Sequence, residues 1–304
     1  MTVAFLFPGQ GADLAGLAGA WRYHGSPVPD LIASAARHAG VSERELLAAG
    51  AAGTARTNLH QPALTAVSTG IVLALEEHAV RPDIVAGHSL GEVAACAAAG
   101  YMSAGDAVAV AALRVRVMAR EAGRHPGGMI ALQLVGRATA EAAIRSARAH
   151  GHAAIAAHNA DDQWVVSGDW ATLRAIAAAV PATPLAVAGP WHTEAMAGAV
   201  AEYRIALCEA IKAPLRVPLV CNRTGRVVEH ADDLPDVLAG QLTRCVHWTD
   251  TMTTLAKRGV RHMVAVGAAK TLRALVRRQL GGDVTVVIVE TPDDINRARE
   301  ALAR

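Results

Sequence analysis

The sequence predicts an α/β protein in which a large subdomain with a mostly parallel sheet carries a small, inserted, ferredoxin-like subdomain. In both outer parts of the chain, short apolar runs alternate with helical segments, which is typical of a parallel sheet covered by helices on both faces. The middle of the chain has the order β-α-β-β-α-β, which is that of the ferredoxin-like unit. We therefore expect the large subdomain at 1–125 and 190–304 and the small one at 126–189.

In the N-terminal part, each expected element combines a periodic or apolar run with a stop signal. The first strand is ended by the turn sequence "PGQG", and the second helix stops at Gly100. Ser103 and Asp106 form a capping-box pattern, so the third helix should begin there. The expected elements are strands at 3–7 and 84–86 and helices at 61–78, 92–99 and 104–121.

The remaining elements follow from the same signals. The inserted part is expected to have strands at 127–135, 152–160, 163–169 and 183–189 and helices at 138–150 and 170–180. The C-terminal part is expected to have helices at 193–211, 234–256 and 270–280 and strands at 217–222, 262–267 and 284–289. A last helix is announced by Thr291-Pro292-Asp293, since proline suits the first turn of a helix.

Composition narrows the functional class. The 304 residues are 52% hydrophobic and 18% charged, which is typical of a globular protein and not of a disordered one. A net charge of +2 gives no case for nucleic-acid binding. The four cysteines lack C-x-x-C spacing, which favours reduced thiols in the cytoplasm and no metal site. We also expect neither a signal peptide nor a membrane span.

Ser89 lies in the pattern G-x-S-x-G, formed by "GHSLG" at 87–91. A nucleophilic serine of this kind needs a buried strand, a strained turn and a helix, and the flanking segments predict all three. This context makes the large subdomain α/β-hydrolase-like. The alternative is an ordinary Gly/Ser turn between a strand and a helix.

Two further residues could act with Ser89. His192 lies in the loop "GPWHTEAM" just before an amphipathic helix, where a catalytic base could sit, although a structural histidine also fits. Arg114 falls on the apolar stripe of its helix with Val110 and Val117, and no acid on that helix can reach it. Its partner is either an acid elsewhere in the core or a substrate carboxylate held by the guanidinium.

Taken together, the motifs resemble the malonyl-CoA:acyl carrier protein transacylase family from end to end. The matching segments are "FPGQGA" (7–12), "HQPAL" (60–64), "GHSLGE" (87–92), "LRVRVM" (113–118), "NADDQWVVSG" (159–168), "GPWHTEAM" (189–196) and "QLTRCVHW" (241–248). The resemblance implies that His192 deprotonates Ser89 and that Arg114 binds the malonyl carboxylate. It also implies that the backbone carbonyl of Gln241 orients His192.

The resemblance implies further roles. The backbone N–H groups of Gln10 and Leu90 would hold the oxyanion. The side chains of His88, Asn159 and Trp191 would line the substrate site. Trp191 departs from the family pattern, and its bulk would favour malonyl over a branched malonyl group; alternatively, the indole only packs the cleft between the subdomains. The implied substrates are malonyl-CoA and an acyl carrier protein with its phosphopantetheine; no bound cofactor is expected, and the chain should be a monomer.

Several alternatives stay open. Arg273, Arg277 and Arg278 could receive an acidic carrier protein or form an ordinary solvated helix face. The protein could be a serine thioesterase or hydrolase, a transacylase for a non-malonyl group in a polyketide pathway, or a non-catalytic docking subunit. Fatty acid synthesis, polyketide synthesis and malonate decarboxylation could each use such a site.

Overall fold

The computed structural model describes residues 2–9, 14–23, 25–48, 57–212 and 217–302. Its strands form two five-stranded sheets, with helices packed around both. The large sheet has the order β10-β9-β1-β2-β7, and every neighbouring pair in it is parallel. Its strands are β1 (Val3–Phe7), β2 (Ile84–Gly87), β7 (Leu219–Val220), β9 (His262–Val266) and β10 (Thr285–Val289).

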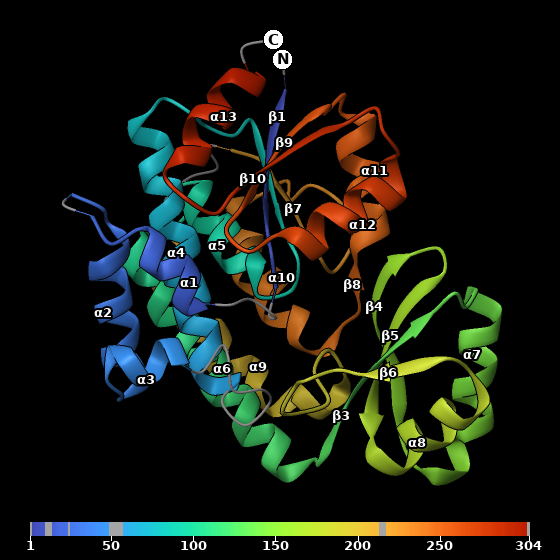
Figure 1. Ribbon diagram of the computed structural model, residues 1–304. Coiled ribbons are helices and arrows are strands. Elements are labelled where there is room, and N and C mark those ends of the chain that lie inside the picture. Colours follow the sequence, from blue (N-terminus) through green and yellow to red (C-terminus); the bar gives the residue numbers. More distant parts are fainter. Residues whose placement is uncertain (1, 10–13, 24, 49–56, 213–216, 303–304) are drawn as a thin grey trace.

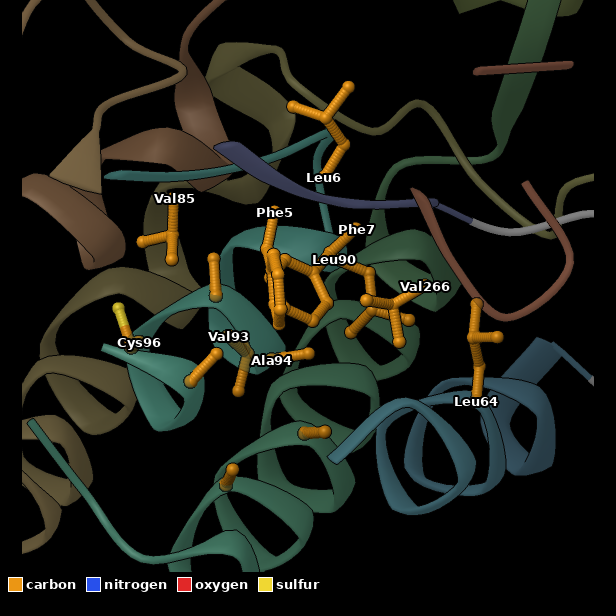
Figure 2. Packing of buried hydrophobic residues seen from close by; sticks show 14 of the residues in the cluster. Phe5, Leu6, Phe7, Leu64, Val85, Leu90, Val93, Ala94, Cys96 and Val266 are labelled. Atoms are coloured by element: carbon orange, nitrogen blue, oxygen red, sulfur yellow. The ribbon is translucent and has the colours of Figure 1, made fainter. Parts of the chain in front are cut away.

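The core of the large part lies between this sheet and its helices. All five residues of β1 are buried, and both phenylalanines have 0% exposure. Figure 2 shows Phe5 and Phe7 directed toward Leu90 and Val93, while Leu6 points to the other face of the sheet. Burial on both faces explains why β1 is an uninterrupted apolar run instead of an alternating one.

Helices cover both faces of the large sheet, as expected (Figure 1). The described helices of this part of the chain, some of which pack on other helices instead of the sheet, are α1 (Leu14–Ala20), α2 (Val28–Ala39), α3 (Glu43–Ala48), α4 (Thr57–Glu77), α5 (Gly91–Ala98), α6 (Ala104–Arg124), α9 (Ala197–Ala210), α10 (Leu234–Gly240), α11 (Trp248–Lys257), α12 (Lys270–Leu280) and α13 (Asp293–Leu302). The predicted cap of α6 is confirmed, since Ser103 Oγ accepts a hydrogen bond from the Asp106 amide at 3.0 Å. Within the described ranges, no helix has the length and apolar character needed to cross a membrane.

The small sheet confirms the predicted ferredoxin-like unit. Its order is β6-β3-β5-β4-β8, and the pairs among the first four strands are antiparallel. Its elements are β3 (Gly127–Gln133), α7 (Arg137–Ser146), β4 (Ala153–Ala160), β5 (Gln163–Asp169), α8 (Trp170–Ala179) and β6 (Ala182–Pro184). Buried side chains between this sheet and α7 and α8, among them Leu132, Val166 and Ile176, form a second hydrophobic cluster.

The predicted helix at 234–256 is wrong. The segment contains α10, a 3₁₀ turn at Gln241–Thr243, the strand β8 (Val246–His247) and α11. β8 pairs in parallel with β4 and joins the two parts of the molecule. A tertiary pairing therefore overrides local helical propensity here. We retain 126–189 as the proposed small subdomain and regard β8 as an edge strand added to it.

Two further regions of the chain differ from expectation. The strand expected at 183–189 is only three residues long, because the chain turns away after Pro184 toward the loop that carries His192. Helices α1, α2 and α3 were not predicted from the sequence. They pack against α4 and place Trp21, Val28 and Ile32 in the core.

Candidate active site

Ser89 occupies a tight turn between β2 and α5. Its φ angle of 53° lies in the left-handed region that non-glycine residues rarely adopt, as expected for a serine held in a strained turn. The two flanking glycines are required by close approach. A Cβ on Gly87 would lie 2.1 Å from the Gly91 backbone, and one on Gly91 would lie 2.2 Å from the Phe7 carbonyl oxygen. The tight turn therefore makes the side chain of Ser89 project away from the surrounding backbone.

His192 is the hydrogen-bond partner of Ser89. Ser89 Oγ lies 2.7 Å from His192 Nε2, and His192 Nδ1 lies 2.9 Å from the backbone carbonyl oxygen of Gln241. Because a carbonyl oxygen only accepts, Nδ1 carries the proton and Nε2 is left to accept from the serine hydroxyl. His192 is 5% exposed and also has a positive φ, 61°. The two residues are thus both held in uncommon backbone conformations that aim them at each other.

The His192 ring is neutral in this environment. Burial and the nearby positive charge of Arg114 together lower the pKa of His192 to about 3. Both effects disfavour the imidazolium. The ring is therefore ready to accept a proton at neutral pH, although it is a weak base until its surroundings change.

Arg114 reaches the site from the buried face of α6 and is 1% exposed. Its guanidinium donates to the side-chain oxygens of Gln61 at 2.8 Å and Gln241 at 2.9 Å, and it lies 3.5 Å from Ser89 Oγ. No carboxylate lies within 4 Å of it in the described part of the chain, so the interpretation as a core salt bridge is not supported. Burial lowers the pKa of Arg114, but arginine remains charged at neutral pH.

Asn222 and Glu92 brace the turn, and the sequence reasoning missed both. Asn222 Oδ1 accepts from the Ser89 amide at 2.8 Å, and its Nδ2 donates to the Gly87 carbonyl. Glu92, in the first turn of α5, accepts from the Asn222 amide at 2.7 Å. Burial raises the pKa of Glu92 to about 7. Glu92 could have been noticed in the sequence, because it is a charged residue in an otherwise apolar helix, as Arg114 is on the apolar stripe of α6. Nothing in the sequence singled out Asn222.

A cavity of about 260 Å³ opens beside the Ser89 hydroxyl, between the two sheets. His192, His88, Asn159 and Trp191 line it, and apolar side chains from β3, β5 and α12 form much of the remaining wall. His88 Nε2 lies 2.8 Å from Asn159 Oδ1, and burial lowers the pKa of His88. Trp191 is 3% exposed and lines the cavity together with His192. The size and lining suit a small acyl group on a thioester arm.

The structure does not bring every predicted residue into one site. Gln10 lies outside the described residues, whereas the backbone N–H of Leu90 has no acceptor within the described ranges and is available for an oxyanion. Arg278 on α12 forms an ion pair with Asp162 in the turn after β4, while Arg273 is half-buried and Arg277 exposed. Among the residues that can be placed, no group of three or more histidine, cysteine, aspartate or glutamate side chains is arranged to hold a metal ion.

The chain is similar to known proteins over nearly its whole length. The family model described as "Acyl transferase domain" matches residues 4–280. The malonyl CoA-acyl carrier protein transacylase of Mycobacterium tuberculosis is 33% identical over 97% of this chain and 98% of its own length. The crystal structure of MCAT from the same species has a TM-score of 0.87 at 31% identity, with 98% of this chain and 99% of that chain covered. The acyl-carrier-protein S-malonyltransferase of Burkholderia pseudomallei has a TM-score of 0.89 at 28% identity, covering 99% of this chain and all of its own.

Proposed function

The chain belongs to the acyl transferase domain family, and we propose on this basis that it moves a malonyl group from coenzyme A to an acyl carrier protein. The acyl group passes through Ser89 and ends on the phosphopantetheine thiol of the carrier. One observation supports a carboxylated acyl group as the substrate. A buried guanidinium without a carboxylate partner among the described residues lies 3.5 Å from the serine hydroxyl.

In the first half-reaction, His192 Nε2 takes the proton of Ser89 as the serine oxygen attacks the thioester carbonyl. The bond between the acyl carbon and the CoA sulfur then breaks, and the thiolate leaves with the proton that His192 returns. The Gln241 carbonyl holds Nδ1–H, so the ring presents the correct nitrogen throughout. This backbone oxygen takes the place of the acid found in a serine triad.

Charge that develops on the thioester oxygen needs donors. The Leu90 amide, at the start of α5, supplies one, and the helix N-terminus adds a favourable partial charge. We assign the second donor to the Gln10 amide, as the family resemblance implies.

Arg114 binds the malonyl carboxylate in this proposal. A planar guanidinium can hold a carboxylate with two parallel hydrogen bonds, and burial strengthens such a pair. An acetyl group lacks the carboxylate and gains nothing from Arg114. The selectivity for malonyl therefore depends on a contact beyond the reacting carbon.

In the second half-reaction, the carrier thiol enters through the cavity beside His88, Asn159 and Trp191 and attacks the malonyl-serine. His192 takes the thiol proton and returns it to Ser89 Oγ as the serine ester bond breaks. All the required groups are side chains or backbone of this chain, so no resident cofactor is needed. For the carrier we propose docking near α12, where Arg273 and Arg277 are not engaged by the ion pair that holds Arg278.

A labelled-substrate experiment tests the proposal against the hydrolase alternative. The protein is incubated with radiolabelled malonyl-CoA, and intact-protein mass spectrometry follows the adduct on Ser89. We expect a stable adduct that disappears when holo-acyl carrier protein is added, with label recovered on the carrier, and no adduct in Ser89→Ala. Rapid release of free malonate without transfer would show that the protein is a hydrolase.

A further inference from the structure

Gln241 contacts both the catalytic base His192 and the guanidinium of Arg114. Its backbone carbonyl accepts from His192 Nδ1, while its side-chain oxygen accepts from Arg114 at 2.9 Å. Its side-chain nitrogen donates to the Ser89 carbonyl at 3.0 Å and to Glu92 Oε2 at 2.5 Å. Gln241 is 2% exposed, so its side chain is hydrogen-bonded to protein groups and shielded from solvent.

The orientation of this amide decides whether Arg114 is held. In the orientation seen, each N–H of Gln241 meets an acceptor and its oxygen meets a donor. Turning the amide over would set NH₂ against the guanidinium and the oxygen against two acceptors. Arg114 would then face a donor in place of an acceptor, and Gln61 would be its remaining amide partner.

Glu92 is the acid that favours the observed orientation through the hydrogen bonds that it accepts. It is 0% exposed, and its two oxygens accept from different donors, the Asn222 amide and the Gln241 side chain. Hydrogen bonds to a carboxylate are stronger than those between neutral groups. Glu92 is also the acid whose charge favours the protonated form of Arg114, although the Gln241 amide lies between them.

We propose that Glu92 is a positioning residue for recognition of the carboxylated acyl group, because its carboxylate fixes the Gln241 amide and this amide holds Arg114 beside Ser89. The inference rests on the proposed function and adds a residue to it. Glu92 itself is not placed to touch the acyl group, since both its oxygens face protein donors. Its influence on malonyl transfer passes through Gln241.

A purely structural role predicts a different result. Glu92 also supports Asn222, which braces the Ser89 turn, so a structural loss would slow every acyl group alike. Glu92→Gln separates the two roles, because one amide oxygen cannot replace two carboxylate oxygens that face two donors. We expect KM for malonyl-CoA in Ser89 acylation to rise about tenfold, while acetyl-CoA acylation changes less than about twofold and serves as the folding readout.

Two controls are available in the same chain. Glu121→Gln removes another buried acid, one that pairs with Arg120 and Arg124 at the end of α6, and should leave the malonyl-to-acetyl ratio unchanged. Glu92→Asp keeps the charge and should recover part of the ratio. Equal losses for malonyl and acetyl in Glu92→Gln would overturn the proposal.

A double-mutant cycle tests the route of the effect. Gln241→Met keeps the backbone carbonyl that holds His192 but removes the amide. If Glu92 acts through this amide, Glu92→Gln should have no further effect on the malonyl-to-acetyl ratio in the Gln241→Met background. A full additional loss would overturn the proposal.

A crystal structure of Glu92→Gln provides a readout that does not depend on turnover. We expect the Gln241 amide to be turned or displaced, with Arg114 moved away from Ser89. An unmoved Arg114 would overturn the proposal even if the wild-type protein transfers malonyl. Conversely, a wild-type protein with no malonyl transfer would overturn the proposed function, while the structure would still decide whether Glu92 positions Arg114.

Discussion

Replacing Arg114 with alanine is the sharpest test of malonyl recognition. The guanidinium has two neutral amide oxygens as partners and no carboxylate within 4 Å among the described residues. A malonyl carboxylate would thus supply its counter-charge. Hydrogen bonds to charged groups contribute about 1.5–3 kcal/mol each, and truncating one side of a buried charged pair costs roughly 2–5 kcal/mol.

We expect Arg114→Ala to lose about 2–4 kcal/mol of transition-state stabilisation for malonyl, because water can enter the space left and solvate part of the carboxylate. At 1.36 kcal/mol per factor of ten, this is a fall of roughly 30- to 1,000-fold in kcat/KM. Acetyl transfer should be retained or should rise, since an acetyl group has no charge for Arg114 to bind.

The assay is rapid-quench formation of acyl-Ser89, measured by intact-protein mass spectrometry with malonyl-CoA and acetyl-CoA in parallel. Arg114→Met is the matched control, because it removes the charge but fills most of the volume. Both variants should show the same loss of malonyl selectivity if charge is the cause. An equal loss for the two acyl groups in both variants would show that Arg114 only supports the fold.

Three other outcomes follow from the site. Because the pKa of His192 is lowered to about 3, kcat/KM for acylation by acetyl-CoA, which does not depend on the Glu92 carboxylate, should stay level from pH 8 down to about pH 5. Arg114→Ala should move the acidic limb to higher pH, and a wild-type limb near pH 6.5 with acetyl-CoA would contradict this. Asn222→Ala removes two side-chain hydrogen bonds to the turn, so we expect a loss of about 1–3 kcal/mol in the free energy of unfolding, measured by denaturant melts, and similar losses of acylation for both acyl groups. Trp191→Ala should enlarge the cavity and raise the methylmalonyl-to-malonyl ratio of acylation rates; an unchanged ratio would show that the indole does not limit the acyl group.

The strand, turn and helix around Ser89 could be predicted because local chemistry decides them. Two glycines at fixed spacing are needed where backbone segments lie closer than a Cβ allows. The burial of Arg114 was also predictable, because helical periodicity places it on the apolar stripe of α6. In both cases a single stretch of sequence contains all the information.

The contacts of Gln241 could not be predicted in the same way. The segment around it was expected to be helical, yet the chain forms a 3₁₀ turn there and then pairs β8 with β4 from the small sheet. That pairing joins residues about 90 positions apart, so the local sequence pattern cannot predict it. The position of the Gln241 side chain between Glu92, Arg114 and Ser89 depends on this tertiary arrangement.

The electrostatics of the site bear on whether malonyl-serine is attacked by a thiol or by water. His192 rests on a backbone carbonyl instead of a carboxylate, and the charge of Arg114 further weakens it as a base. A thiol has a pKa of about 8.5, whereas water has one of about 15.7, so a weak base activates the thiol far more readily. An aspartate behind His192 would stabilise the imidazolium and make water a better substrate. Since His192 already activates the weakly acidic hydroxyl of Ser89, the difference in pKa between thiol and water is what favours transfer to a carrier thiol over hydrolysis.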